Sequence, residues 1–118
     1  MAASASLEGA GPAEPIHVTE ATFAREVEQS SVPVLVDLWA PWCAPCRSIA
    51  PTLEAIAREM AGRIRVAKVN VDENPEIAER LGVQGIPTLV VYKGGREIDR
   101  MVGALPRQAI VSRLEAVT

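Results

Sequence analysis

The feature that most constrains the fold is the run VLVDLWA at residues 34–40, which is apolar apart from one aspartate. A run of this length and β-branched character, preceded by Pro33, predicts a strand that is buried on both faces. A strand of this kind needs covering layers on both sides of its sheet, which in α/β proteins are helices. Its one charged residue, Asp37, is therefore predicted to be a buried carboxylate.

Strand and helix patterns alternate along the rest of the chain. We expect further strands at residues 16–18, 64–71, 88–93 and 96–102, and helices at residues 19–29, 44–60, 75–81 and 106–117. The order βαβαβαββα predicts an α/β fold in which a central mixed five-stranded sheet is flanked by four helices. The last two strands form an antiparallel hairpin that turns at Gly94-Gly95.

Capping residues locate the starts of two of these helices. Thr19 is predicted to be the N-cap of the first helix, with Val18 and Phe23 forming a hydrophobic staple. Asn74 is predicted to cap the short third helix, and Pro75 follows it at the first helical position.

Length and composition limit the class of protein. The 118 residues make about one domain, and a hydrophobic fraction of 48% with 23% charged residues is ordinary for a globular protein. Residues 1–14 are small and polar with no apolar signal core and no arginine, so we expect a flexible extension before a domain at residues 15–118, and a cytoplasmic protein.

The same numbers argue against several kinds of partner. A net charge of −3 disfavours nucleic-acid binding. No apolar run approaches the ~20 residues of a membrane helix. We therefore expect neither nucleic-acid nor membrane partners, and a monomer.

The chemistry is predicted to lie at Cys43-Ala44-Pro45-Cys46, between the buried strand and the second helix. Sulfurs at positions i and i+3 of a helical turn project from the same side and can form a disulfide and open it again. Cys43 falls at the helix N-terminus, where unpaired N–H groups and the helix dipole favour a thiolate. Cys43 is therefore expected to attack a substrate disulfide, and the more buried Cys46 to resolve the mixed disulfide.

A zinc site is the alternative interpretation of two cysteines at this spacing. Structural zinc needs about four ligands. The chain offers two cysteines and one histidine, His17, which is expected far away in the first strand. We therefore expect no metal.

Asp37 lies six residues before Cys43 in the buried strand. Desolvation raises the pKa of a buried carboxyl group, so Asp37 is a candidate proton acceptor near neutral pH. Lys68, on the neighbouring strand, is expected to be its charge partner. The alternative is a buried ion pair with a structural role alone.

The stretch WAPWCAPCR at residues 39–47 closely resembles the active-site signature of the thioredoxin family. The resemblance runs from about residue 16 to the C-terminus, through AP at 50–51, VAKVNVDENP at 66–75, GIPT at 85–88 and VGA at 102–104. It implies the thioredoxin fold and a general protein disulfide reductase. Ala44 stands where typical members have glycine, so Ala44 and Pro45 are expected to tune the reduction potential.

The resemblance also implies roles for single residues. Asp37 would be the general base for Cys46, acting through water, with Lys68 modulating it. Pro87 would follow a cis peptide bond and leave the backbone of Ile86 free to pair with an extended substrate. Substrate proteins would bind an apolar surface around Cys43 formed by Trp42, Gly85, Ile86, Pro87, Gly103 and Ala104.

Other residues are assigned to packing or to the surface. Trp39, inside the buried strand, is expected to pack rather than to touch substrate. The acidic residues Asp72, Glu73, Glu76 and Glu79 are expected to form a solvated helix face.

Cofactors and partners follow from the resemblance as well. It implies re-reduction by a flavin-dependent, NADPH-using thioredoxin reductase, and clients such as reductases and peroxidases. The chain itself would bind no cofactor, because the cysteine pair is the redox group and no glycine-rich dinucleotide fingerprint is present.

Two other functions stay open at this point. One is a disulfide oxidant or isomerase of the same fold, although such relatives usually have a histidine where this chain has Pro45. The other is a non-catalytic binding subunit, against which the intact cysteine pair with its aspartate and proline argues.

Overall fold

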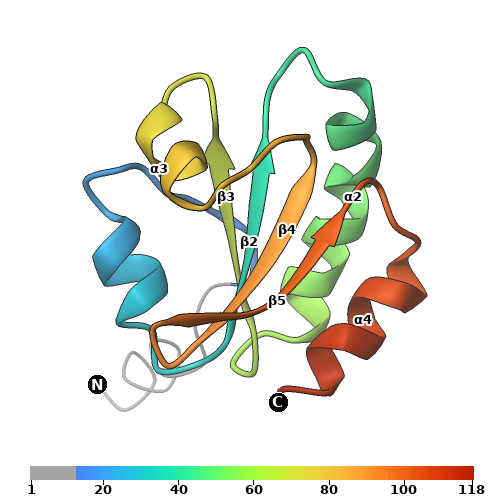
Figure 1. Cartoon of the computed structure of the whole chain (residues 1–118). Helices are drawn as coiled ribbons and strands as arrows, with labels where there is room; N and C mark the ends of the chain where they lie inside the picture. Colours follow the sequence, from blue (N-terminus) through green and yellow to red (C-terminus); the bar gives the residue numbers. More distant parts are fainter. Residues whose placement is uncertain (1–12) are drawn as a thin grey trace.

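The buried strand predicted at residues 34–40 is β2 (Val34–Trp39), and it lies at the centre of a five-stranded sheet with the order β1-β3-β2-β4-β5 (Figure 1). The computed structural model describes residues 13–118, so most of the extension predicted at residues 1–14 lies outside the described residues. β3 pairs in parallel with β1 and β2, and β4 pairs antiparallel with β2 and β5. The other strands are β1 (Ile16–His17), β3 (Arg65–Asn70), β4 (Thr88–Lys93) and β5 (Arg96–Val102).

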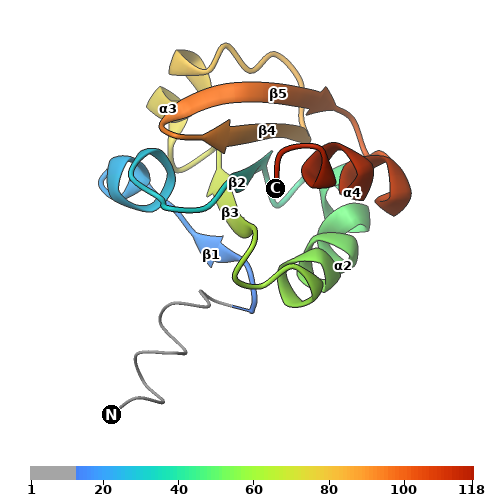
Figure 2. The same cartoon turned by 90° about the horizontal axis from the view of Figure 1, so that it is seen from below.

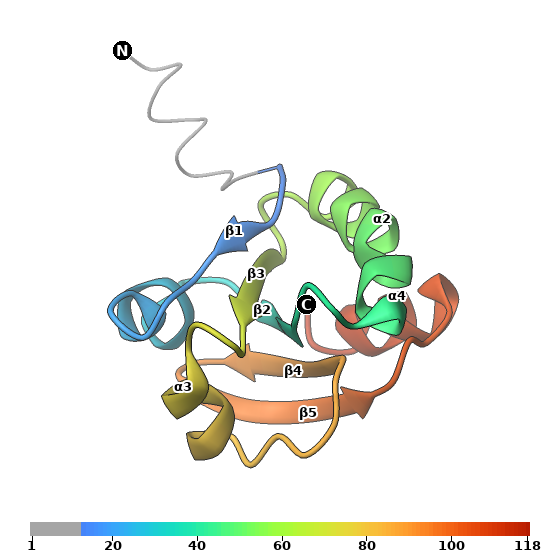
Figure 3. The same ribbon diagram turned by 90° about the horizontal axis from the view of Figure 1, so that it is seen from above.

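Helices cover both faces of the sheet, as Figures 2 and 3 show. They are the π-helix η1 (Ala24–Glu28), α2 (Ala44–Glu59), α3 (Pro75–Arg80) and α4 (Arg107–Glu115). This arrangement confirms the predicted mixed sheet with four flanking helices. Among residues 13–118, no helix is both long enough and apolar enough to cross a membrane.

The two faces of the sheet support two separate cores, because successive side chains of a strand point to opposite faces. Leu35 packs with Leu53 of α2 and Ile110 of α4 on one face. Val36 packs with Val27 of η1 and Ile77 of α3 on the other. Each fully buried Val or Leu side chain contributes about 1.5–3 kcal/mol, so β2 is stabilised from both sides.

The first helix begins later than predicted, and Thr19 is not its N-cap. Residues 19–22 form a turn in which the Thr19 N–H donates to Oγ1 of Thr22 at 3.0 Å, and the Thr22 N–H donates to the Thr19 carbonyl at 3.0 Å. Threonine side chains compete in this way for local backbone groups and so delay a helix. Val18 and Phe23, the predicted staple, are both buried in the core beneath η1 and α3.

The side chain of Asn74 does not cap α3 as predicted. Its Oδ1 instead accepts a hydrogen bond from the Glu20 N–H at 3.0 Å, and its Nδ2 donates to the Asn70 carbonyl at 3.1 Å. The carboxylate of Glu20 accepts from the N–H of Glu76 in the first turn of α3, at 2.7 Å. The group that satisfies this helix terminus therefore comes from the loop before η1, where no local sequence pattern would reveal it.

The β4–β5 hairpin provides a test of local backbone constraint. Gly94 and Gly95 both have positive φ angles, 62° and 81°. A Cβ atom on Gly95 would lie 3.2 Å from the Glu28 carbonyl oxygen, whereas one on Gly94 would meet nothing within 4 Å. Gly94→Ala should cost about 1 kcal/mol from the left-handed backbone alone. Gly95→Ala should cost about 1 kcal/mol more, because overpacking is added.

Urea unfolding of both variants measures this difference. Gly94→Ala is the matched control, since it shares the backbone conformation but not the contact. Equal losses of unfolding free energy would show that η1 moves away from the hairpin without cost.

Candidate active site

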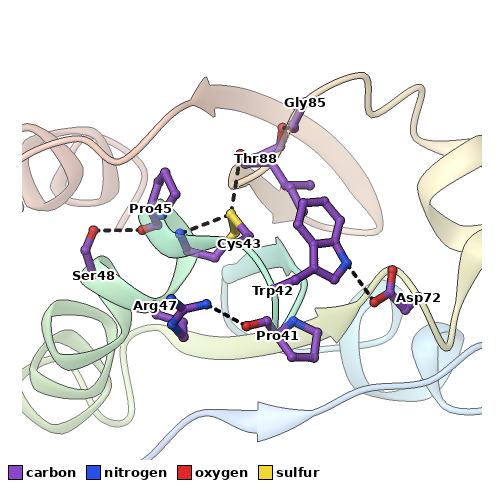
Figure 4. Close-up of a disulfide and its surroundings, with 11 residues drawn as sticks. Pro41, Trp42, Cys43, Pro45, Arg47, Ser48, Asp72, Gly85 and Thr88 are labelled. Carbon is purple, nitrogen blue, oxygen red and sulfur yellow. Dashed lines mark hydrogen bonds between the residues drawn. A yellow bond between two sulfur atoms is a disulfide. The ribbon is translucent and has the colours of Figure 1, made fainter.

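The cysteine pair lies where β2 passes into α2. Cys43 is the N-cap of α2, and its Sγ accepts a hydrogen bond from the Cys46 N–H at 3.2 Å. Pro45 lies in the first turn, where a missing N–H removes no helical hydrogen bond. A disulfide joins the two cysteines (Figure 4). The predicted position of this pair at a helix N-terminus is therefore correct.

Both cysteines are largely shielded from solvent, with Cys43 5% and Cys46 2% exposed. They pack against each other and Ala40, with Trp39 and Ile86 at the border of this small cluster. The predicted packing role of Trp39 is therefore confirmed. Arg47 closes the turn before Cys43 by donating from Nη1 to the Pro41 carbonyl at 2.7 Å (Figure 4).

A loop from a distant part of the sequence lies against Cys43. The Ile86–Pro87 peptide bond is cis, as the resemblance implied. The Ile86 carbonyl oxygen lies 3.8 Å from Sγ of Cys43. Within residues 13–118, neither the N–H nor the carbonyl of Ile86 forms a hydrogen bond with another backbone group. The hydroxyl of Thr88, which the sequence analysis did not single out, donates to the Gly85 carbonyl and fixes this loop.

Trp42 projects into solvent beside the cysteines and is 67% exposed. Its indole Nε1 donates to Oδ2 of Asp72 at 2.9 Å (Figure 4). Asp72 follows β3 in a turn, where its own N–H donates a hydrogen bond to Oδ1 of Asn70 at 2.9 Å. The prediction that Asp72 belongs to a solvated helix face is therefore wrong. The contact joins residues 30 positions apart, so no local pattern could have indicated it.

A groove of about 390 Å³ opens between Trp42 and the end of α3. It is lined by Trp42, Val71, Ala78, Val83, Gln84, Gly85 and Ile86. Of the residues predicted to form the apolar surface, three line this groove. Pro87 is buried beside it, and the Gly103 N–H donates to the Pro87 carbonyl at 2.9 Å, so Gly103 and the exposed Ala104 continue the surface on the far side.

Asp37 lies in the core, 1% exposed, on the face of the sheet covered by α2. Neither carboxylate oxygen has a hydrogen-bond partner among residues 13–118. Burial raises its pKa from the ordinary value of 3.8 to about 7, and the positive charge of Lys68 opposes this shift. Asp37 is therefore a carboxyl group able to take up and release a proton near neutral pH.

Lys68 sits directly opposite Asp37 in the β2–β3 register. It affects the aspartate through its charge, as predicted, but none of the ion pairs among residues 13–118 joins the two side chains. The Lys68 ammonium lies 4.7 Å from the centre of the Trp39 ring instead. A cation over an aromatic face is stabilised by the ring quadrupole. This contact with Trp39 takes the place of a direct ion pair between Lys68 and Asp37.

The raised pKa of Asp37 makes the stability of the fold depend on pH. At pH values below about 3 the carboxyl is mostly protonated in both folded and unfolded chains, so it causes almost no difference in stability. As the pH rises towards 7, the unfolded chain ionises freely while the folded chain does not, and stability falls. Asp37→Asn should therefore raise the unfolding free energy by up to about 4 kcal/mol at pH 8 and by almost nothing below about pH 3.

Unfolding of both proteins across this pH range measures the effect. Asp99→Asn is the control, because Arg113 lowers the pKa of Asp99 and its contribution has the opposite pH dependence. A stabilisation by Asp37→Asn that does not change with pH would mean that the Asp37 pKa is not raised.

No group of three or more His, Cys, Asp or Glu side chains within residues 13–118 is arranged to hold a metal ion. His17 pairs with Lys68 in the β1–β3 register.

Comparison with known proteins agrees with this geometry. The sequence model of the Thioredoxin family matches residues 14–116. Thioredoxin 1 from Nostoc sp. is 52% identical over 98 residues, which cover 83% of this chain and 92% of that protein. Thioredoxin from Streptomyces clavuligerus is 52% identical over 95 residues, covering 80% and 88%. A mutant thioredoxin from Halobacterium salinarum superposes with a TM-score of 0.83 at 35% identity, over 92% of this chain and 95% of that one.

Proposed function

The chain belongs to the thioredoxin family, and from that premise we propose how its residues carry out protein disulfide reduction. It is a thiol–disulfide oxidoreductase whose redox group is the Cys43–Cys46 pair. The observation that carries the proposal is the position of Cys43. Its sulfur is the N-cap acceptor of α2 and lies against the Ile86 backbone, at the edge of the apolar groove.

In the reduced protein, Cys43 acts as the attacking thiolate. The Cys46 N–H and the positive end of the α2 dipole favour negative charge on its sulfur. The thiolate attacks one sulfur of the client disulfide, and the other client sulfur leaves as a thiolate. Cys46 then loses its proton and attacks Sγ of Cys43, which releases the second client sulfur. Two electrons pass to the client, and the chain is left with the Cys43–Cys46 disulfide.

Asp37 accepts the proton that Cys46 must lose. Its pKa of about 7 suits a group that takes up and gives back a proton near neutral pH. Neither of its oxygens has a hydrogen-bond partner in the described part of the chain, so both can bind a water molecule that relays the proton from the thiol. Lys68 moderates this pKa through its charge.

Clients bind across the surface around Cys43. The free backbone groups of Ile86 support pairing with an extended client segment, as in strand addition. Trp42 and the groove beside it would receive an apolar side chain near the client disulfide. Gly85, Gly103 and Ala104 continue this surface without bulky side chains that would hold a client away from the sulfur, and the buried Pro87 lies beside it.

The family implies reductase partners and disulfide-containing clients in general. We propose specifically a flavin-dependent, NADPH-using thioredoxin reductase as the electron donor, and reductases and peroxidases as clients. On this proposal the chain binds no cofactor of its own and acts as a monomer in the cytoplasm, where glutathione keeps thiols reduced.

Single cysteine variants test the assigned order of events. With insulin as the disulfide substrate, Cys46→Ser should lose turnover and accumulate a mixed disulfide with the client, because the resolving thiol is absent. Cys43→Ser should lose turnover and accumulate none. Mass spectrometry after acid quenching separates the two outcomes. A mixed disulfide formed by Cys43→Ser in place of Cys46→Ser would reverse the assignment.

The reduction potential separates a reductase from an oxidant of the same fold. Titration of the pair against dithiothreitol should give a value more negative than the glutathione poise of about −220 to −260 mV. Ala44→Gly, which restores the residue typical of the family, should shift the potential if Ala44 tunes it. A potential above about −200 mV would favour the oxidant or isomerase function.

A further inference from the structure

Arg100 of β5 reaches across to the end of α3. Its Nη2 donates to the Leu81 carbonyl at 2.6 Å. The same guanidinium is held by Glu97, with Nε donating to Oε2 at 2.7 Å and Nη2 to Oε1 at 2.8 Å. Leu81 is the C-cap residue of α3, and a cation that binds a carbonyl there also interacts favourably with the helix dipole.

The segment that follows Leu81 forms one wall of the groove beside Cys43. Residues 82–87 lead from the end of α3 to the start of β4, as Figure 1 shows. Val83, Gln84, Gly85 and Ile86 all line the groove. The position of this wall therefore decides the width and shape of the groove.

Few hydrogen bonds hold this segment, although Val83 packs against the core that contains Ile77 and Ile86 packs against the cysteine cluster. The N–H groups of Gly82 and Val83 bond back to α3, but within residues 13–118 those of Gln84, Gly85 and Ile86 bond to no backbone carbonyl. At its far end the Thr88 hydroxyl binds the Gly85 carbonyl. The wall is thus fixed at two ends, and Arg100 supplies the side-chain contact at the first of them.

We propose that Arg100 is a positioning residue for client binding: it fixes the 82–86 wall of the groove against β5 and thereby sets the affinity for protein clients. The inference rests on the proposed role of this groove in binding clients. Arg100 lies away from the sulfurs, on β5, and touches no reacting atom. It therefore acts on the affinity for clients rather than on the exchange of disulfides.

A matched control is available on the opposite face of β5. Arg113 of α4 makes a similar two-pronged ion pair with Asp99, at 2.7 and 2.6 Å, and also donates to the Arg100 carbonyl at 3.2 Å. Among the described residues, Arg113 forms no hydrogen bond or ion pair with Leu81 or with a residue that lines the groove. Arg100→Gln and Arg113→Gln therefore each break a pair of the same kind, but only the first releases the wall.

The experiment compares the two variants with the unaltered protein in steady-state reduction of insulin, and in the single-turnover reaction of the reduced pair with a small aromatic disulfide. Arg100→Gln should raise the KM for insulin about fivefold, with kcat and the small-disulfide rate unchanged. Arg113→Gln should change none of the three. Arg100→Lys, which keeps one cationic donor, should recover part of the KM.

Hydrogen exchange gives a readout of the wall itself. The Gly82 and Val83 amides, which bond to Glu79 and Ala78, should exchange faster in Arg100→Gln and not in Arg113→Gln. An unchanged KM in Arg100→Gln, or an equal rise in Arg113→Gln, would overturn the inference. A protein that fails to reduce insulin before any substitution would instead overturn the proposed function.

Discussion

The burial of β2 between two helical layers is the constraint on which the rest of the structure depends. A strand with no solvent-exposed face must have its side chains packed on both sides, and helices from before and after it in the sequence supply the two cores. The same burial removes Asp37 from water and raises its pKa. It also fixes where the chain leaves the sheet, and that exit places Cys43 at the first turn of α2. The burial of β2 therefore underlies the stability of the fold, the raised pKa of Asp37 and the position of Cys43.

Burying Asp37 lowers the stability of the fold, and the proposed reaction depends on this buried group. The buried Asp37 carboxyl has no hydrogen-bond partner in residues 13–118 and is therefore unfavourable when charged; the positive charge of Lys68 offsets only part of this penalty. Replacing the pair with apolar residues would stabilise such a core. On the proposed mechanism, the site keeps an unfavourable group because a desolvated carboxyl has a proton affinity suited to exchange with a thiol near neutral pH.

The local patterns of the sequence were enough to predict the sheet, the four helices and the start of α2 at Cys43, because strand burial, helical period and proline position act over a few residues. The resemblance added the cis bond before Pro87. What could not be predicted are contacts between distant side chains and backbone: Glu20 at the start of α3, Asp72 on the Trp42 indole, and Arg100 on the Leu81 carbonyl. Each contact depends on which loops the fold brings together. Polar surface residues follow no periodic pattern in the sequence from which such a contact could be predicted.

The two cores support different parts of the site. The sulfurs rest on α2, whose apolar face belongs to the core shared with α4, whereas the groove wall leads from α3, whose Ile77 belongs to the other core. The single five-stranded sheet separates the two cores. Substitutions in the core beneath α3 can therefore change what the molecule recognises while the α2 side of the redox pair and the surroundings of Asp37 stay the same. Ile86, which contacts both the groove and Cys43, is where the two properties meet. One scaffold can in this way bind different clients while its redox chemistry is kept.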